Sequence, residues 1–408
     1  AHALHDARET FAKLGVGVSE PRLDFTQATA WKDGVVAQMT GGVAGLLKAN
    51  DVEWIRGTGR FTSPTTIAVD GDDDVTFRSA IVATGSYPMR PPIPGLDSPR
   101  CVDSTGLLSQ TEVPRRLVVL GGGIIGCEFA SIFAHFGSEV TIIEMLPTLI
   151  PQEDADAAKE LKKAFKRRGI AMHLEKQCTG VDEVGGHIVV HFGDGESVKA
   201  DLMLVAVGRA PSVKGLGLDE IGVPTDPRSG IATDDHMRTA IPTIFAAGDV
   251  AGRWQLAHTA FREGEIAAEN AMGHDSTLGN PAVPRPIYTD PEIAGVGLTE
   301  AEARERHGDG VAVGVFPWVA NARATMSGTT TGWVKSIHET TYGELLGLVI
   351  VGPHATDLIE VGVVAIDAES TVQTVADGIA PHPTLSEAIK EAGLVALDRA
   401  IHLPPKRR

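Results

Sequence analysis

Hydrophobic and polar positions along the chain follow the pattern of an α/β protein. Residues 117–120 form an apolar run that ends in glycines, a helical pattern follows, and a second apolar run covers 140–143. This order predicts strand, tight turn, helix and strand, the unit from which parallel sheets are built. Farther along, residues 187–200 alternate around Asp194-Gly195, a typical turn dipeptide, and predict a β-hairpin.

Two stretches share one plan and indicate an internal repeat. "DGDDDVTFRSAIVATGSYP" and "DGESVKADLMLVAVGRAP" each contain a polar turn, a short strand and an apolar strand that ends at Gly85 or Gly208, before a proline. The repeat predicts two dinucleotide-binding domains. In the second copy, a glycine-rich loop begins at Gly121 and the apolar strand leads to Gly208. The same spacing counted back from Gly85 would place the first copy's glycine-rich loop before residue 1. We therefore expect the first domain to be incomplete at its N-terminus.

The remaining pattern predicts a return to the first domain and then a different module. "TIFAAGDV" is a buried strand followed by Asp249 and by a helix rich in Ala and Glu. An acid directly after such a strand can hold a ribose or ribityl hydroxyl, although a plain helix-entry acid also fits the local pattern. From about Pro281 the alternating stretches "GWVKSIH" and "LLGLVIVG" and two late helices predict an α+β module.

A glycine-rich turn joins the first of these strands to its helix. Gly121, Gly123 and Gly126 match G-x-G-x-x-G, and Glu144 ends the next strand. In this pattern the first glycine permits the turn, the second lets the backbone approach a pyrophosphate, and the third lets helix and strand pack closely. The helix N-terminus supplies N–H groups for phosphate oxygens. Glu144 would accept a hydrogen bond from a ribose 2′-hydroxyl and repel a 2′-phosphate, which favours NAD over NADP.

Composition excludes several function classes. The 408 residues carry a net charge of −17, which argues against binding to nucleic acid or to anionic membranes. No apolar run approaches the length of a membrane helix. The sequence has 3 cysteines, Cys101, Cys127 and Cys178, which are far apart. They predict neither a disulfide framework nor a metal site, and they fit a reducing cytoplasm.

The stretch "APHPTLSEA" near the end of the chain places a histidine between two prolines. Proline restricts its own backbone and that of the residue before it, so His382 lies on a stiff segment. A histidine with a carboxylate partner, here Glu387, suits acid/base chemistry. The local sequence also fits a capping box, with Thr384 as N-cap and Glu387 as its partner. Glu387 has two carboxylate oxygens, so both interpretations can hold.

Taken together, these motifs resemble the pyridine nucleotide-disulfide oxidoreductases, and among them the dihydrolipoamide dehydrogenases. The resemblance runs in order along the chain through "IVATGSYP", "LGGGIIGCE", "VAVGRAP", "IFAAGDV", "LAHTAFREG", "YTDPEIAGVG" and "HPTLSEA". It implies an FAD-binding domain at 1–112 that is continued at 240–280, an NAD-binding domain at 113–239, and an interface domain at 281–408. The fold class would be α/β with two nested Rossmann-like domains, plus an α+β module that makes a homodimer.

The resemblance also implies roles for particular residues. FAD would lie along Thr84, Gly85 and Asp249, with backbone groups around Ala257 and His258 near its ring. NAD would take Gly121, Gly123, Gly126, Glu144 and Gly208. His382, acting in the neighbouring subunit's site, would be the acid/base for a dithiol, with Glu387 orienting it. The partner would be a lipoyl-bearing protein of a 2-oxoacid dehydrogenase or glycine-cleavage complex.

The sequence departs from this family in one respect. The family's redox disulfide is a Cys-x4-Cys pair soon after the first glycine-rich loop, and the cysteines present match neither position. In the family, the carboxylate at the position of Glu128 pairs with a lysine after that disulfide. We therefore expect the chain as given to be inactive toward dihydrolipoamide. The alternatives are a flavin- or NADH-binding diaphorase without the disulfide, and a non-catalytic NAD-binding remnant.

Overall fold

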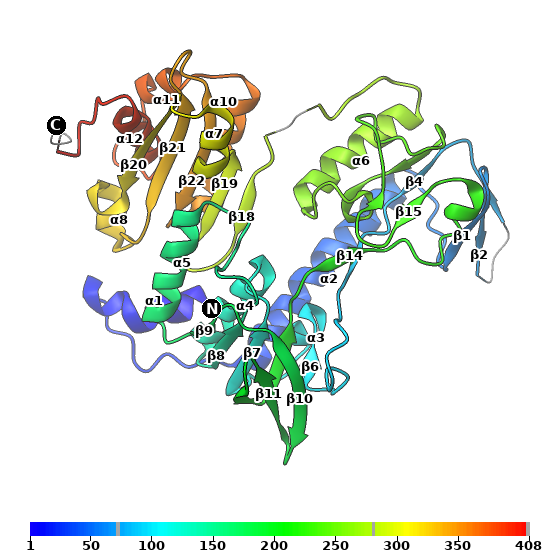
Figure 1. Cartoon of the computed structure of the whole chain (residues 1–408), viewed down its shortest axis with the longest axis horizontal. Coiled ribbons are helices and arrows are strands. Elements are labelled where there is room, and N and C mark those ends of the chain that lie inside the picture. The colour runs from blue at the N-terminus through cyan, green and yellow to red at the C-terminus, as the bar shows by residue number, and fades with distance from the viewer. Residues whose placement is uncertain (71–73, 280–281, 405–408) are drawn as a thin grey trace. The chain divides into compact units, whose positions relative to one another are not determined.

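The computed structural model describes residues 1–70, 74–279 and 282–404. They form two compact units, each built from segments that are distant in sequence. Unit 1 comprises Ala1–Phe25, Arg90–Val207 and Ala282–Arg408, and unit 2 comprises Thr26–Met89 and Gly208–Pro281. Figure 1 labels the elements of both.

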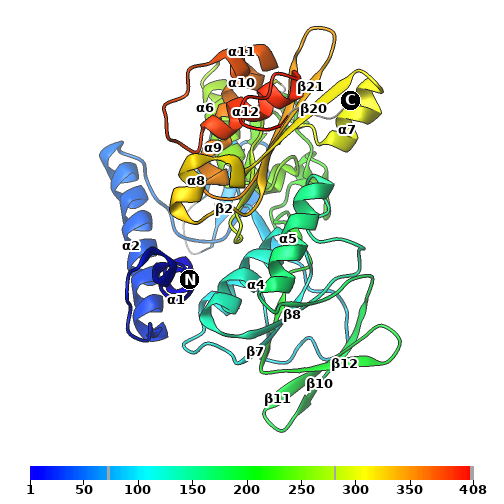
Figure 2. The same cartoon turned by 90° about the vertical axis from the view of Figure 1, so that its left-hand side faces the viewer.

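A five-stranded parallel sheet forms the centre of the first part of unit 1. Its strand order is β6-β13-β7-β8-β9, and α4 and α5 lie next to each other against it (Figure 2). The elements are β6 (Cys101–Val102), α3 (Ser104–Leu108), β7 (Arg116–Leu120), α4 (Ile124–Phe136), β8 (Glu139–Ile143), α5 (Ala155–Arg167), β9 (Ala171–His173) and β13 (Leu202–Val205). The strand–turn–helix–strand unit predicted around the glycine motif is confirmed. We call this part the parallel-sheet domain.

The predicted hairpin is confirmed as part of a small antiparallel sheet inserted into this domain. Strands β10 (Cys178–Val184), β11 (His187–Phe192) and β12 (Glu196–Ala200) pair in chain order. At the other end of the domain, α1 (His2–Glu9) contacts α4 and is followed by the 3₁₀ turn η1 (Phe11–Leu14).

The second part of unit 1, the C-terminal domain, is an antiparallel sheet with helices, as the alternating pattern predicts. Its strand order is β18-β19-β22-β21-β20. The strands are β18 (Arg285–Ile287), β19 (Ile293–Gly297), β20 (Val311–Pro317), β21 (Trp333–Glu339) and β22 (Leu345–Val351). The helices are α7 (Glu300–His307), η4 (Trp318–Ala320), α8 (Ala322–Ser327), α9 (Ala355–Leu358), α10 (Glu360–Asp367), α11 (Val372–Asp377) and α12 (Glu387–Ala396). The expectation of two late helices was wrong: between β22 and residue 404, where the described part ends, there are four, because turns at 359, 368–371 and 378–386 divide the segment.

Unit 2 consists of short sheets and two long helices. Its strands are β1 (Gly59–Ser63), β2 (Thr66–Val69), β3 (Val75–Thr76), β4 (Ala80–Val82), β5 (Ser86–Pro88), β14 (Arg209–Pro211), β15 (Thr225–Asp226), β16 (Gly230–Ile231) and β17 (Ile244–Ala246). Its helical elements are α2 (Phe25–Ala49), η2 (Asp219–Ile221), η3 (Gly248–Ala251) and α6 (Ala257–Ala271). The two repeat copies meet where β5 pairs with β14.

Helix α2 is unusual because none of its residues is buried. Its first residue, Phe25, still belongs to unit 1 and packs there against the rings of Phe133 and Phe136 on α4. Beyond it the helix exposes apolar side chains to solvent, among them Trp31, Val36, Met39, Val43 and Leu46. Among the residues that the structure describes, no helix is long and apolar enough to cross a membrane.

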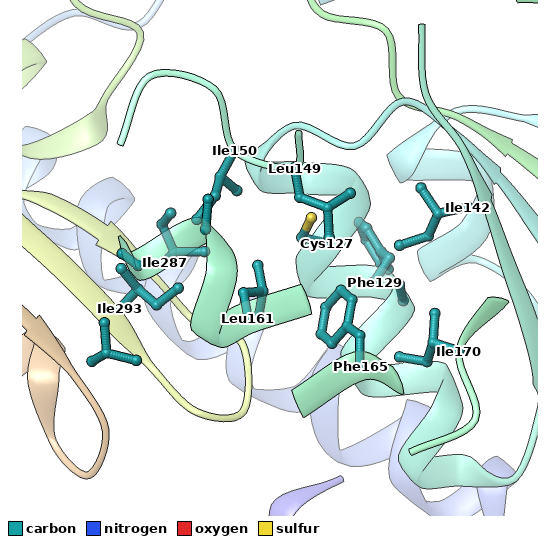
Figure 3. Close-up of a cluster of buried hydrophobic side chains, with 14 of the residues drawn as sticks. Cys127, Phe129, Ile142, Leu149, Ile150, Leu161, Phe165, Ile170, Ile287 and Ile293 are labelled. Carbon is teal, nitrogen blue, oxygen red and sulfur yellow. The ribbon is translucent and has the colours of Figure 1, made fainter. Parts of the chain in front are cut away.

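One apolar core joins the two domains of unit 1 (Figure 3). It contains Cys127 and Phe129 of α4, Ile142 of β8 and Phe165 of α5, and it continues to Ile293 of the C-terminal sheet. Burying a side chain of this size contributes roughly 1.5–3 kcal/mol. The two domains are therefore held together by the same kind of packing that holds each one.

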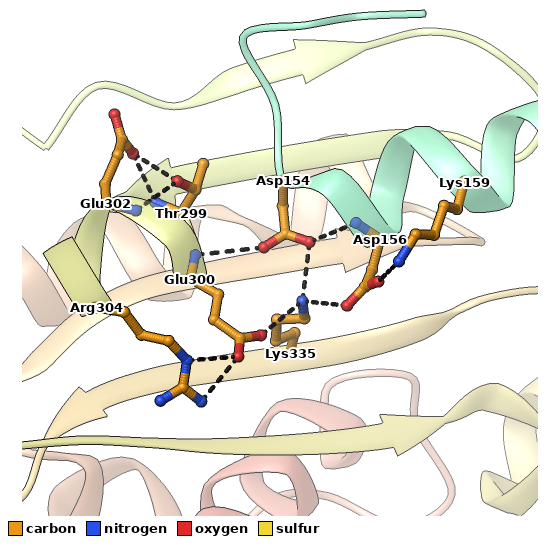
Figure 4. A network of polar contacts seen from close by, with 8 residues as sticks. All are labelled: Asp154, Asp156, Lys159, Thr299, Glu300, Glu302, Arg304 and Lys335. Carbon is orange, nitrogen blue, oxygen red and sulfur yellow. Dashed lines mark hydrogen bonds and ion pairs between the residues drawn. The ribbon is translucent and has the colours of Figure 1, made fainter. Parts of the chain in front are cut away.

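A buried lysine adds a polar connection between these domains (Figure 4). Lys335 of β21 is 2% exposed, and its Nζ donates to Asp154 Oδ1 (2.8 Å), Asp156 Oδ2 (2.8 Å) and Glu300 Oε2 (3.2 Å). Burial alone would lower the pKa of Lys335, but the hydrogen bonds to these carboxylates outweigh it and raise the pKa. The network connects the start of α5, the start of α7 and strand β21 of the C-terminal sheet.

Removal of this ammonium group should be costly. Lys335→Met leaves the buried carboxylate of Asp154 without its cation, and we expect the free energy of unfolding to fall by about 3–5 kcal/mol. The matched control is Lys159→Met, since Lys159 pairs with Asp156 (3.0 Å) but is exposed, so its loss should be below about 0.5 kcal/mol. Denaturant unfolding measures both, and equal small losses would contradict a structural role for Lys335.

Candidate functional site

The glycine motif adopts the tight turn that its spacing predicts. Gly121 has φ +111°, and a Cβ there would lie 2.3 Å from the carbonyl oxygen of Ala206. A Cβ at Gly126 would lie 2.0 Å from the oxygen of Gly121, so only glycine lets α4 approach the turn this closely. At Gly123, by contrast, a Cβ would meet nothing within 4 Å. The first and third glycines thus serve packing, and the second leaves open space above the turn.

Gly123 is also the N-cap of α4, and no side chain caps this helix end. The N–H groups of the first turn are therefore not taken by a capping side chain, as a phosphate-binding helix start requires. This arrangement fits the pyrophosphate of a dinucleotide.

Glu144 lies beside this turn, as its position at the end of β8 predicts. Its side chain accepts hydrogen bonds from Gly122 N (Oε2, 2.5 Å) and Leu146 N (Oε1, 2.7 Å). The residue is buried. Each carboxylate oxygen can accept a second hydrogen bond. The backbone therefore fixes the carboxylate next to the open space at Gly123, where it can receive a ribose hydroxyl.

In unit 2, Asp249 lies in a polar cluster formed by the ends of the repeated strands. Its carboxylate accepts a hydrogen bond from the hydroxyl of Ser86, and its Oδ2 lies 4.0 Å from Nε of Arg209. Arg209 also donates from Nε to Ser86 Oγ (2.7 Å) and from a terminal nitrogen to Ser86 O (2.8 Å). Ser86 and Arg209 follow directly after Gly85 and Gly208. Equivalent positions of the two repeat copies therefore lie beside the same carboxylate, that of Asp249.

The other residues predicted for the flavin lie in the same unit. Thr84 is exposed, and its hydroxyl donates to the oxygen of Ser212 (2.8 Å). Gly85 has φ +70° and a Cβ there would meet nothing within 4 Å. Ala257 and His258 begin α6, whose N-terminus has no side-chain cap. Open space at a glycine and a helix N-terminus without a side-chain cap are features of a site that receives polar oxygen atoms of a ligand.

Glu263 supports this site, and the sequence analysis missed it. The residue is fully buried, and its Oε2 accepts a hydrogen bond from the backbone N–H of Gly248 (2.6 Å). Burial raises the pKa of this carboxyl, and the hydrogen bond from Gly248 opposes the shift. The contact fixes the turn on which Asp249 lies. A buried acid two turns into a helix carries no motif of its own, so only the fold identifies it.

The structure brings His382 and Glu387 together. Nδ1 of His382 lies 2.8 Å from Glu387 Oε1, and the side chain of His382 is 70% exposed. The second oxygen of Glu387 accepts a hydrogen bond from Thr384 N (2.8 Å). Burial alone would raise the pKa of Glu387, but the Thr384 N–H and His382 outweigh it and lower the pKa. The carboxylate therefore stays charged and orients the ring.

Only half of the predicted capping box forms. Glu387 contacts the backbone of Thr384 as expected, but the Thr384 hydroxyl donates to Pro381 O (2.7 Å) instead of capping the helix. Ser386 precedes the first residue of α12 and is the N-cap, without a side-chain hydrogen bond. Thr384 as N-cap was thus wrong, because its hydroxyl stabilises the turn that carries His382.

None of the three cysteines has the character of a redox-active thiol. All are buried and free. Burial raises the pKa of Cys101 to about 11, and it also raises the pKa of Cys127 and of Cys178. A reactive cysteine needs an accessible thiolate. Cys127 packs in the core that Figure 3 shows, which fits a structural role.

Glu128, the acid whose family partner is a lysine, has a backbone partner in this structure. Its Oε1 accepts a hydrogen bond from Tyr288 N (2.8 Å). Burial raises the pKa of Glu128, and the hydrogen bond from Tyr288 opposes the shift. The carboxylate thereby connects α4 to the segment between β18 and β19.

Comparison with known families agrees with this architecture. Residues 2–264 match the family model described as pyridine nucleotide-disulphide oxidoreductase, and residues 283–393 match the dimerisation domain of the same family. The chain belongs to the pyridine nucleotide-disulphide oxidoreductases. It is a dihydrolipoyl dehydrogenase-like flavoprotein of the α/β class, with FAD/NAD Rossmann-like domains followed by a dimerisation domain, as the sequence predicted.

Individual relatives agree over nearly the whole chain. The dihydrolipoyl dehydrogenase of Thermus scotoductus is 42% identical over 413 aligned residues, which cover 98% of this chain and 88% of the relative. That of Bacillus subtilis is 39% identical, with 93% and 83% covered. Among solved structures, LpdA of Mycobacterium tuberculosis has a TM-score of 0.89 at 29% identity, covering 96% of this chain and 86% of that one. The HOCl-induced flavoprotein disulfide reductase RclA of Escherichia coli has a TM-score of 0.86 at 28% identity, with 96% and 87% covered.

The contrast between Gly126 and Gly123 can be tested by adding one methyl group to each. Gly126→Ala should lower the free energy of unfolding by at least about 2 kcal/mol, because the new Cβ collides with the backbone of Gly121. Gly123→Ala is the matched control in the same turn and should unfold like the unsubstituted protein. Thermal unfolding measures both, and similar stabilities for the two variants would rule out the close approach.

Proposed function

We propose that the chain is built for the oxidation of a protein-bound dihydrolipoyl group with NAD as the electron acceptor. The observation that carries the proposal is the exposed pair of His382 and Glu387 on a segment bounded by Pro381 and Pro383. A dithiol must lose a proton before it can attack a disulfide, because the thiolate is the nucleophile. The relatives' name, dihydrolipoyl dehydrogenase, supports this substrate class.

In this proposal His382 receives the thiol proton. Its Nδ1 is engaged by Glu387, so Nε2 is the ring atom left to accept the proton, and the charged carboxylate stabilises the imidazolium that results. Glu387 is a positioning residue, since it acts through the ring. The exposure of His382 suits a base that serves the site of a neighbouring subunit, as the family resemblance implies.

Two dinucleotide sites would serve the electron transfer. The turn at Gly121, Gly123 and Gly126 with Glu144 would hold NAD, joined by Gly208 as the family pattern implies. The residues that fit FAD are Thr84, Gly85, Asp249 and the start of α6 at Ala257 and His258. Bound FAD would supply the two-electron acceptor between the dithiol and NAD. Within the chain, Ser86 holds Asp249 by a direct hydrogen bond, and Glu263 holds the turn before it through the N–H of Gly248.

The redox disulfide of this chemistry has no counterpart among the cysteines of the chain. Their burial and raised pKa values leave the dithiol no thiol partner in the 408-residue polypeptide. The proposal therefore includes inactivity of this polypeptide toward dihydrolipoamide. The alternative is a diaphorase, in which electrons pass from NADH through flavin to an acceptor without any disulfide.

A homodimer belongs to the same proposal. Within the matched dimerisation domain, α10 exposes Val361 and Val364. Next to them lies an open, mostly apolar groove between α10 and α11, lined by Glu360, Val361, Val364, Ala365, Ala368, Ser370, Thr374 and Val375. Exposed apolar surface of this kind typically marks a protein–protein contact. We propose that a second copy covers it, with a lipoyl-bearing protein as the transient partner in the cytoplasm.

Nucleotide binding can be tested directly. We expect NADH to bind at least about tenfold more tightly than NADPH, because Glu144 repels a 2′-phosphate. Gly123→Ala should weaken NADH binding by about tenfold or more without loss of stability, since the methyl group enters the space for the pyrophosphate. Gly264→Ala, at an equally open position on α6, is the control and should bind NADH normally. Nucleotide fluorescence titration measures these affinities, and equal binding of NADH and NADPH would refute the role of Glu144.

The substrate proposal is tested by supplying the protein with FAD, NAD and dihydrolipoamide and recording NADH absorbance. No NADH should form, because no thiol of the chain can receive electrons from the dithiol. NADH consumption with ferricyanide under the same conditions would favour the diaphorase. NADH formation from dihydrolipoamide that disappears in His382→Gln would disprove the inactivity and support the role of His382.

A further inference from the structure

Helix α12 carries a second histidine–carboxylate pair beside the first. Glu387 and Glu391 are four residues apart on the helix and therefore lie on the same face. Glu387 Oε1 lies 2.8 Å from His382 Nδ1, and Glu391 Oε1 lies 2.9 Å from His402 Nδ1. One histidine reaches the helix from the segment before it and the other from the segment after it.

We propose that His402 and Glu391 form a positioning pair that sets the proton affinity of the catalytic pair His382–Glu387. This inference rests on the proposed function, since it takes His382 to be the acid/base group. His402 would not touch the substrate. It would act by placing a titratable charge one helical turn from the carboxylate that orients His382.

The geometry of the second pair is fixed by packing. Ala400 and Leu403, on either side of His402, pack against the core of the C-terminal domain. Arg399 holds the start of this segment through its hydrogen bond to Asp377 (3.0 Å). The ring of His402 is thus held over α12 while its outer edge stays open to solvent for proton exchange.

Glu391 depends on His402 for its charge balance. The residue is 4% exposed, and within the described part of the chain its Oε2 has no hydrogen-bond partner. A buried carboxylate with one partner is sensitive to that partner's protonation, because burial penalises an uncompensated charge. The pair therefore carries a net charge that changes when His402 takes up or releases a proton.

The second pair is electrically coupled to the first. The charge of His402 is one of the causes that lower the pKa of Glu387, after the larger effects of Thr384 and His382. A positive charge on His402 opposes a second positive charge on His382, whereas a negative charge on Glu391 favours it. Removing His402 should therefore raise the pH midpoint of the His382 titration, and removing the charge of Glu391 should lower it.

The other charged or titratable groups around α12 are paired elsewhere or buried. On the helix, Lys390 donates to Gly378 O (2.9 Å), and Arg399 is paired with Asp377 of α11. On β21, His338 lies on the same face as Val334, toward α12, and is buried, which lowers its pKa; Lys335 and Ile337 lie on the opposite face, toward the parallel-sheet domain. β20 contributes no charged side chain. These groups are unchanged in the variants below.

The test is the pH titration of the His382 ring by proton NMR, with His382→Gln used to assign its resonance. In His402→Gln the midpoint should rise by about 0.3 pH unit or more, and in Glu391→Gln it should fall. His191→Gln removes an exposed histidine paired with Asp182 (2.9 Å) on the hairpin sheet and should leave the midpoint unchanged.

Opposite shifts in His402→Gln and Glu391→Gln would establish the coupling. An unchanged midpoint in a folded His402→Gln protein, or shifts of the same sign in both variants, would overturn it. If His402→Gln fails to fold, Glu391→Gln alone decides, because an unchanged or raised midpoint there overturns the inference. The titration involves no dihydrolipoamide, so failure of the proposed function would appear in the turnover assay and not here.

Discussion

The position of β21 is the constraint on which the arrangement of unit 1 depends. One face of this strand carries Lys335 and Ile337 toward the parallel-sheet domain, and the other carries Val334 toward α12. The buried ammonium group is stable only while its carboxylates from α5 and α7 surround it. A strand held in this way on one side gives α12 a fixed platform on the other. The parallel-sheet domain and α12, which carries Glu387, thus pack on opposite faces of the same strand.

The candidate site residues lie in strand–glycine–polar-residue segments that recur along the chain. At each, a short strand leads within three residues to a glycine, and a polar side chain lies where the backbone turns. Gly121 leads to the turn that Glu144 fixes, and Gly85 and Gly208 lead to Ser86 and Arg209 beside Asp249. Glycine permits the backbone to come close, and the acids supply acceptors for ligand hydroxyls. This repetition is what the proposed binding of two nucleotides by one chain would require.

Much of this arrangement could be predicted from the sequence because its determinants are local. The glycine spacing predicted the turn before α4, the alternation around Asp194-Gly195 predicted the hairpin, and the Pro-His-Pro segment predicted an oriented ring. Lys335 could not be predicted in the same way. Its partners come from three segments far apart in the chain, and a lysine in an alternating strand usually faces water.

The pair His402–Glu391 escaped prediction for a related reason. Histidine and carboxylate are 11 residues apart with a helix end between them. Only the return of the chain over α12, fixed by Ala400 and Leu403, brings them together. Glu263 likewise has no sequence signal, because its significance lies in burial beneath a turn that begins 15 positions before it. Contacts across such distances follow from tertiary packing rather than from spacing.

Helix α2 has a consequence for how the chain folds. Along its 25 residues it contains Gly34, Gly41, Gly42 and Gly45, and a Cβ at any of them would meet nothing within 4 Å. Each interior glycine disfavours the helix by about 1 kcal/mol relative to alanine, and no burial along the helix offsets this. Such a segment gains order late in folding and opens early. Proteases that require an unfolded stretch of backbone would therefore cut here while the sheets of both units remained intact.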